Sequence, residues 1–163
     1  MKKTNSKYIV VKKSKIHNNG IFAKKDVPKG IKVLQYVGEK IDKTEGAKRE
    51  VLQDKLAAKN KKYGVVYVFE LDKKWDIDGS FEYNTAKYIN HSCNPNCRIS
   101  IKNGEIWIVS KRRIKKGEEI TYNYGYDFEG GDHHECKCGC GNCVGYILDE
   151  DHWPKLKRAI KGQ

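Results

Sequence analysis

Short runs of β-branched and aromatic residues, each closed by a polar turn, dominate the hydrophobic pattern of this chain. Such runs are typical of strands, and Gly, Pro, Asn and Asp between them are typical of turns. Asn103-Gly104 lies between two of the runs and predicts a hairpin. The expected strands are 8–12, 20–23, 31–37, 65–71, 75–77, 99–101, 106–109 and 119–124.

Only residues 44 to about 60 carry a convincing helical pattern. Thr44 is a candidate N-cap, and Ala47, Val51, Leu52 and Leu56 follow at helical spacing. The remaining positions are rich in Lys and Glu, which predicts a solvated surface. Many short strands with one main helix indicate a mostly β, α+β domain.

The length of 163 residues predicts one domain with a modest core. No apolar run is long enough to cross a membrane, and no apolar segment follows Lys2 and Lys3, so neither a membrane span nor a secretory signal is expected. The net charge of +12 favours a nucleic-acid or acidic partner. All of this excess lies in residues 1–62, where 18 Lys and Arg face 6 Asp and Glu; residues 63–163 hold 15 of each.

Six cysteines occur, and four of them lie within residues 136–143. In a chain without a secretory signal, such a cluster favours zinc over disulfides and indicates a reducing, intracellular location. The segment from 126 to 135 is polar and rich in Gly, as expected of a mobile linker, and a basic tail ends the chain.

Two stretches invite a functional interpretation. Residues 90–96 are small or polar between apolar neighbours, which fits either an Asx-rich turn or a binding loop. Tyr122, Tyr124 and Tyr126 alternate along the last expected strand. They form either a half-buried aromatic ladder or a set of hydroxyls that converge on a polar atom.

These stretches, with others in the same order, resemble a SET-domain protein lysine methyltransferase with a post-SET zinc module. The matching blocks are residues 14–23, Tyr-Val-Gly-Glu at 36–39, Tyr-Val-Phe-Glu-Leu at 67–71, Ile-Asp at 77–78, residues 84–93 ending in Asn-His-Ser-Cys, residues 118–124, and the Cys-x-Cys-x4-Cys-x-Gly spacing at 136–145. Two departures stand out. Asn18 replaces the first Gly of the family's Gly-x-Gly loop, and Asn tolerates a left-handed backbone. Lys87 and Tyr88 replace Arg and Phe.

The resemblance implies a SET-domain fold of several small sheets, with a knot-like threading of the C-terminal part and a small zinc-bound tail. It places the SET domain at residues 8–126, a linker at 127–135, the post-SET zinc module at 136–153 and a basic tail at 154–163.

The implied activity is transfer of a methyl group from S-adenosylmethionine to a lysine ε-amine. By the resemblance, Tyr124 is the catalytic tyrosine, Tyr36 is a second channel tyrosine and Phe69 walls the channel. Tyr122 occupies the position that limits the product mainly to mono- or dimethyl-lysine. The implied cofactor contacts are His17, Asn18, Asn19, Gly20, Tyr67, Asn90 and His91. His91 is expected to hold its loop rather than move a proton.

The implied structural zinc ligands are Cys93, Cys136, Cys138 and Cys143. A local set that uses Cys140 in place of Cys93 is the competing arrangement, although Cys-x-Cys-x-Cys spacing is crowded. Whether Cys140 or Cys97 replaces one of the four ligands stays open at this point.

The implied partner is a lysine-bearing protein or peptide, for which a histone is one candidate. The basic N-terminal third could additionally contact nucleosomal DNA, and oligomeric state is not readable. A compact domain of this kind acts in the cytoplasm or nucleus, and it also fits a bacterial or viral effector in a host nucleus. Two rivals remain: a basic, zinc-containing module that binds nucleic acid or chromatin without catalysis, and a non-catalytic reader of lysine peptides.

Overall fold

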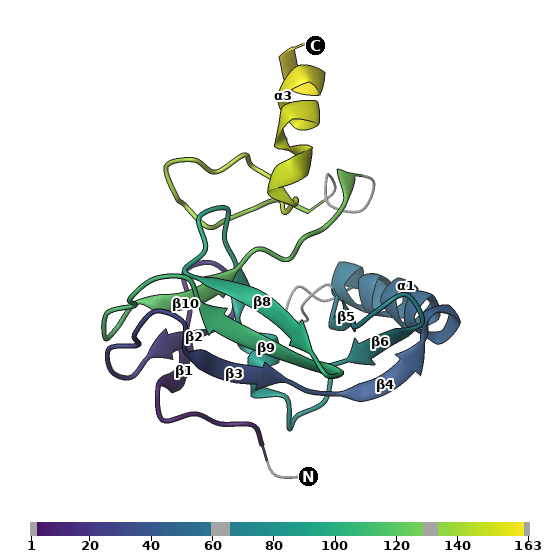
Figure 1. The fold of residues 1–163 in the computed structure, drawn as a ribbon. Coiled ribbons are helices and arrows are strands. Elements are labelled where there is room, and N and C mark those ends of the chain that lie inside the picture. Colours follow the sequence, from purple (N-terminus) through teal and green to yellow (C-terminus); the bar gives the residue numbers. More distant parts are fainter. Residues whose placement is uncertain (1–2, 60–65, 129–133, 162–163) are drawn as a thin grey trace.

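Three small sheets and two α-helices make up the computed structural model, which describes residues 3–59, 66–128 and 134–161 (Figure 1). The strands are β1 (Ile9–Lys13), β2 (Asn19–Ala23), β3 (Lys32–Tyr36), β4 (Glu39–Asp42), β5 (Val68–Glu70), β6 (Trp75–Asp78), β7 (Asn90–His91), β8 (Cys97–Lys102), β9 (Glu105–Ser110) and β10 (Glu119–Tyr122). The helices are α1 (Lys43–Lys59) and α3 (Trp153–Lys161), with short 3₁₀ turns η1 (Thr85–Tyr88) and η2 (Glu150–His152). The predicted mostly β fold class is confirmed.

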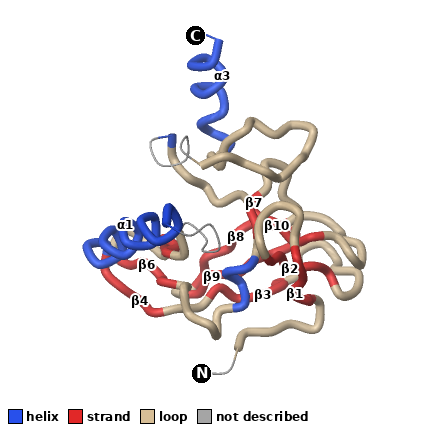
Figure 2. Tube along the Cα trace, turned by 180° about the vertical axis from the view of Figure 1, so that it is seen from behind, coloured by secondary structure: helices blue, strands red, loops and turns tan. Residues whose placement is uncertain are grey.

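The C-terminal strand β10 lies inside the first sheet, whose order is β1-β2-β10-β7. It pairs antiparallel with β2, where Ile120 faces Ile21, and parallel with β7, where Tyr122 faces His91. The Asn-His pair at 90–91 and the tyrosine-rich strand β10, far apart in sequence, are therefore direct neighbours (Figure 2).

The other two sheets follow the orders β3-β9-β8 and β4-β6-β5. The predicted hairpin between β8 and β9 is confirmed: Asn103 and Gly104 both have positive φ, at 54° and 75°. Positive φ at both central residues suits the right-handed twist of the flanking strands. Isoleucine is the commonest residue of the core, which includes the fully buried side chains of Ile21, Ile106, Ile108, Ile114 and Ile120.

Helix α1 differs from its prediction in two respects. It begins at Lys43, and the Asp42 carboxylate accepts a hydrogen bond from the Glu45 amide at 2.9 Å, so Asp42 caps the helix in place of Thr44. Its apolar residues do not face the core: Val51, Leu52 and Leu56 are 53%, 57% and 46% exposed. The helix approaches β6 instead through Gly46, where an added Cβ would lie 2.3 Å from the Asp76 carboxylate.

Several element boundaries also differ from the prediction. Strand β10 ends at Tyr122, and β5 begins at Val68, with residue 65 outside the described residues. Strands β4 and β7 were not predicted, because β4 has one apolar residue and β7 is a polar pair that the fold places beside β10.

The end of the chain is helical rather than a plain basic tail. Helix α3 covers most of the predicted tail at 154–163, and it projects away from the sheets (Figure 1). Much of the predicted linker, residues 129–133, lies outside the described residues. Within the described ranges, no helix combines the length and apolar character needed to cross a bilayer.

Candidate active site

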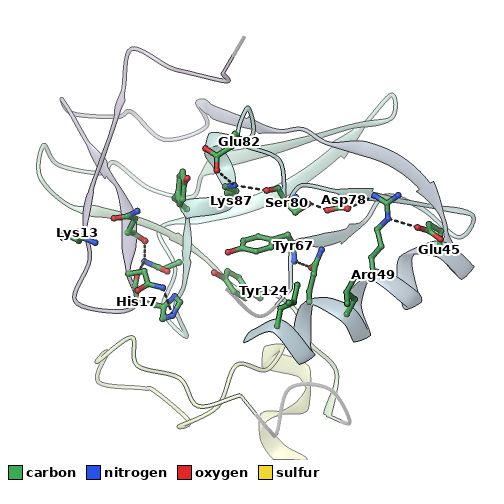
Figure 3. Close-up of a pocket in the computed structure, with 17 residues that line it drawn as sticks. Lys13, His17, Glu45, Arg49, Tyr67, Asp78, Ser80, Glu82, Lys87 and Tyr124 are labelled. Carbon is green, nitrogen blue, oxygen red and sulfur yellow. Dashed lines mark hydrogen bonds and ion pairs between the residues drawn. The ribbon is translucent and has the colours of Figure 1, made fainter. Parts of the chain in front are cut away.

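Two cavities adjoin each other between helix α1 and the first sheet. The first, of about 770 Å³, extends from the loop before β2 to α1 (Figure 3). The second, of about 570 Å³, lies against the aromatic residues of β5 and β10. Tyr67, Lys87 and Tyr124 line both cavities, so these three residues form the wall between them.

The loop before β2 forms one side of the first cavity. Asn18 has φ of 41°, so it adopts the left-handed conformation that its place in the motif predicts. The Asn90 side-chain amide donates to the carbonyl oxygens of Asn19, at 3.1 Å, and His17, at 3.4 Å. The structure thus brings His17, Asn18, Asn19 and Asn90 together at this cavity.

Glu119 is a site residue that the sequence patterns did not single out. Its carboxylate accepts hydrogen bonds from the Asn90 amide at 2.8 Å and from the Ser14 hydroxyl at 2.8 and 2.9 Å. Gly20 lies directly behind, where an added Cβ would be 2.3 Å from this carboxylate. Gly20 therefore supports the cavity wall by leaving room for Glu119 and does not line the cavity itself.

Tyr124 is held at both its backbone and its hydroxyl. The hydroxyl donates to the Ile89 carbonyl oxygen at 2.9 Å, and the Tyr124 amide donates to His91 Nδ1 at 3.2 Å. Since the carbonyl can only accept, the hydroxyl hydrogen is used there and the oxygen lone pairs are left for another donor. Burial raises the pKa of Tyr124 well above that of an ordinary phenol, so the residue is neutral.

Aromatic rings wall the second cavity. Tyr36 lies 5.2 Å from Phe69, which lies 6.1 Å from Tyr122, centroid to centroid. The Tyr36 hydroxyl donates to the Tyr67 carbonyl oxygen at 2.7 Å. Burial raises the pKa of both Tyr36 and Tyr122 well above the ordinary range. The rings of Tyr122, Tyr124 and Tyr126 are in contact in sequence order, at 5.0 and 5.8 Å between centroids, as the aromatic-ladder interpretation predicts. Convergence of their hydroxyls on one polar atom stays a prediction.

His91 lies behind Tyr124 and lines neither cavity. The residue is 3% exposed. Its ring packs edge-on to Tyr124 at 5.4 Å between centroids, and its Nε2 is 3.6 Å from the Cys93 sulfur. Burial lowers the pKa of His91 to about 4, so the imidazole is neutral near pH 7. His91 thus contacts Tyr124 and Cys93, and its expected role of holding its loop stays a prediction.

The two cavities differ in charge. The first has carboxylates at Glu45, Asp78 and Glu82 and cations at Lys13, Arg49 and Lys87. The second has three carboxylates, at Glu50, Glu70 and Asp149, and only the wall residue Lys87 as a cation. Lys87 Nζ donates to the Ser80 carbonyl oxygen at 2.8 Å.

Four sulfurs from distant parts of the chain converge beside the site. The Sγ atoms of Cys93, Cys136, Cys138 and Cys143 all lie within 4.8 Å of one another. Cys93 Sγ is 3.7 Å from that of Cys136 and 3.8 Å from that of Cys143. A tetrahedral site with Zn–S bonds of about 2.3 Å places its sulfurs about 3.8 Å apart, so the group fits zinc. Cys140 Sγ lies 3.3 Å from Cys138 but is not in the group, and Cys97 is buried elsewhere in the core.

Comparison with known proteins defines the class. The family model for the SET domain matches residues 18–125, about two thirds of the chain. The chain therefore belongs to the SET-domain family.

Its relatives include "Histone-lysine N-methyltransferase trr" of Drosophila melanogaster and "Histone-lysine N-methyltransferase 2D" of Homo sapiens, each 36% identical over 140 residues. These matches cover 83% of this chain but only 6% and 2% of the relatives. "Histone-lysine N-methyltransferase ATXR7" of Arabidopsis thaliana is 35% identical over 160 residues, which is 96% of this chain and 11% of that protein.

Proposed function

We propose that this protein is a protein-lysine N-methyltransferase that uses S-adenosylmethionine. The observation that carries the proposal is the wall shared by the two cavities, where Tyr124 reaches both. A methyl donor on one side and a lysine side chain on the other would meet at this wall. Membership of the SET family and relatives named as histone-lysine methyltransferases support this use of the site.

The first cavity suits the methyl donor. Its volume is within the range of about 300–1,000 Å³ that is usual for small-molecule sites, and it offers both charges to a zwitterionic amino-acid group. His17, Asn18, Asn19, Tyr67 and Asn90 would hold the cofactor, with Gly20 and His91 supporting their positions from behind. When bound, S-adenosylmethionine supplies an activated methyl group.

The second cavity suits the lysine. A free lysine ammonium has a pKa near 10.4 and must lose a proton before its nitrogen can attack. The rings of Tyr36, Phe69 and Tyr122 exclude water, and desolvation lowers the pKa of a lysine amine. The hydroxyls of Tyr36 and Tyr124 donate their hydrogens to backbone carbonyls. Their oxygens can therefore accept hydrogen bonds from the N–H groups of the amine and so orient its lone pair.

The position of Tyr122 supports a limit on the number of methyl groups that the target lysine receives. Among the described residues its hydroxyl has no hydrogen-bond partner, although the residue is only 7% exposed and lines the second cavity. This hydroxyl can hold the amine or a water in space that a third methyl group would need. We expect mono- and dimethyl-lysine from the wild type and a shift toward trimethyl-lysine in Tyr122→Phe, measured by mass spectrometry. Wild-type product that is mainly trimethyl-lysine would contradict the limit.

The substrate that fits is a basic, lysine-bearing protein. The carboxylates of Glu50, Glu70 and Asp149 around the second cavity favour cations beside the target lysine. A histone is the first candidate because the relatives are named for histone lysine, and chromatin would then be the place of action. We further propose that Cys93, Cys136, Cys138 and Cys143 bind a structural zinc ion.

Methyl transfer from labelled S-adenosylmethionine tests the proposal. Histones, a lysine-rich peptide and the same peptide with every lysine replaced by arginine serve as substrates, and the protein alone measures automethylation. Incorporation of the labelled methyl group into histones or the lysine-rich peptide, but not into the arginine peptide, supports the proposal. Peptide binding without label would identify a reader instead, and nucleic-acid binding alone would identify a binding module.

A further inference from the structure

Two basic turns lie side by side at one edge of the molecule. Residues 24–30 lie between β2 and β3, and residues 111–118 join β9 to β10; together we call them the double turn. Val27 and Ile114, both fully buried, bridge the two turns with N–H···O distances of 2.9 Å in each direction. Figure 1 shows both turns on the side of the molecule away from helix α1.

The double turn concentrates half of the net charge of the chain. It carries eight cations and two carboxylates, a net charge of +6 out of +12. All eight cations are exposed: Lys24, Lys25, Lys29, Lys111, Arg112, Arg113, Lys115 and Lys116. Five of them come from residues 63–163, whose net charge is zero. The fold therefore builds this basic surface from two distant parts of the sequence.

Both carboxylates are used inside the double turn. Asp26 accepts from the Arg113 guanidinium and from the Lys116 amide at 2.9 Å. Glu118 accepts from Arg112 at 2.8 Å and from the Lys115 amide at 2.6 Å. Among the described residues, none of the six lysines makes an ion pair. The acids therefore stiffen the turns and leave the lysines available to a partner.

We propose that the double turn binds the phosphate backbone of a nucleic-acid duplex without reading its sequence. Lysine binds phosphate as a point charge, and the two arginines that could read base edges are engaged in ion pairs. Stacking of single-stranded bases needs an open aromatic ring. The Tyr8 ring beside the double turn has Lys7 and Lys25 over it, at 5.4 and 5.1 Å. These features favour a duplex.

This binding goes beyond methyl transfer and does not depend on it. Neither turn contributes a residue to the two cavities. It also moves the expected nucleic-acid contact from residues 1–62 as a whole to a surface that takes three of its eight cations from residues 24–30 and five from residues 111–118.

Salt-dependent binding of a short DNA duplex tests the proposal, with fluorescence anisotropy as the readout. The test variant is Lys111→Gln with Lys115→Gln and Lys116→Gln. Its control is Lys48→Gln with Lys55→Gln and Lys59→Gln, which removes the same charge from exposed positions of α1. Because each phosphate contact contributes about 0.9 to the slope of log K against log salt, the test variant should flatten that slope by about 2 to 3. The control should leave it unchanged.

The proposal would be overturned if the two variants lost the same amount of salt-dependence slope. It would also be overturned if the wild type did not bind the duplex at low salt. Tighter binding to polyglutamate than to the duplex at equal charge would also overturn it, in favour of an acidic protein. Equal binding of duplex RNA would support backbone recognition. Thermal melting checks that each variant is folded. If the Lys111, Lys115 and Lys116 variant is not folded, Lys24→Gln with Lys29→Gln replaces it. A failure of methyl transfer leaves these outcomes unaffected.

Discussion

At the residue scale, hydrogen bonds to backbone carbonyls decide what the tyrosines can do. A phenol has one hydrogen, and in Tyr36 and Tyr124 it is donated to the carbonyls of Tyr67 and Ile89. The oxygens therefore face the cavities as acceptors. Glu119 acts one step further back, since it fixes Asn90 and with it the loop at His17–Asn19.

Replacing Tyr124 by Phe should lower kcat by about a hundredfold or more, because the amine loses an acceptor that orients its lone pair. The fold should persist, since the ring stays in contact with Tyr122 at 5.0 Å. The matched control is Tyr83→Phe, which also removes one hydroxyl but lines neither cavity. Near-normal turnover in Tyr124→Phe, measured under saturating substrate, would rule out this role.

At the scale of elements, ion pairs rather than apolar packing hold α1 beside its sheet. Arg49 donates to Asp78 and Glu39 at 2.7 Å and to Glu45 at 2.8 Å. The Asp78 side chain is only 5% exposed. Burial alone would raise the pKa of Asp78, but the hydrogen bonds from Arg49 and Ser80 outweigh it and lower that pKa below its usual value.

Arg49→Ala should therefore destabilise the protein by about 2–3 kcal/mol. This is at or just below the lower end of the range of about 3–5 kcal/mol for breaking a buried pair, because Arg49 is a quarter exposed. Lys48→Ala on the same helix is the control. An Asp whose pKa is lowered by folding stabilises the native state above its unfolded pKa of about 3.9 and loses this effect as the pH falls. The difference between wild type and Arg49→Ala in urea unfolding should thus be largest near pH 7 and shrink below pH 4. A difference that is constant with pH would exclude the ion pair as its cause.

At the scale of the whole molecule, the cysteine cluster connects the C-terminal segment to the body. Cys93 follows β7 beside His91 and Tyr124, whereas the other three cysteines precede α3. The Asp149 amide also donates to the Tyr126 carbonyl oxygen at 2.9 Å, and Asp149 lines the second cavity. A metal at the cluster would therefore fix one side of the second cavity.

Cys93→Ser should lower bound zinc well below one ion per chain, measured by atomic emission, and should reduce methyl transfer. Cys140→Ser should keep full zinc, because Cys140 is outside the group of four. Chelation of the wild type should reproduce the Cys93→Ser phenotype, and added zinc should reverse it. Zinc that is retained by Cys93→Ser and lost by Cys140→Ser would instead establish the local set of ligands.

The sequence by itself determined the local features of this protein. Short runs of β-branched and aromatic residues predicted most strands, Asn103-Gly104 predicted the hairpin, and the ordered motifs predicted the SET family. These features could be predicted because short-range pattern and turn chemistry encode them. The convergence of Cys93 with the C-terminal cysteines came from the resemblance, and no local pattern indicated it.

Only the tertiary structure decided which distant groups meet and which faces stay open. Glu119 meets Ser14 across 105 positions, and β10 enters between β2 and β7. The apolar stripe of α1 predicts a buried face, yet ion pairs and Gly46 orient the helix so that Leu52 remains exposed. The charge count assigned the basic excess to the first third of the chain, but packing of Val27 on Ile114 builds a basic surface from both halves. The physical reason is that contacts and exposure depend on how the elements pack together, which local sequence pattern does not contain.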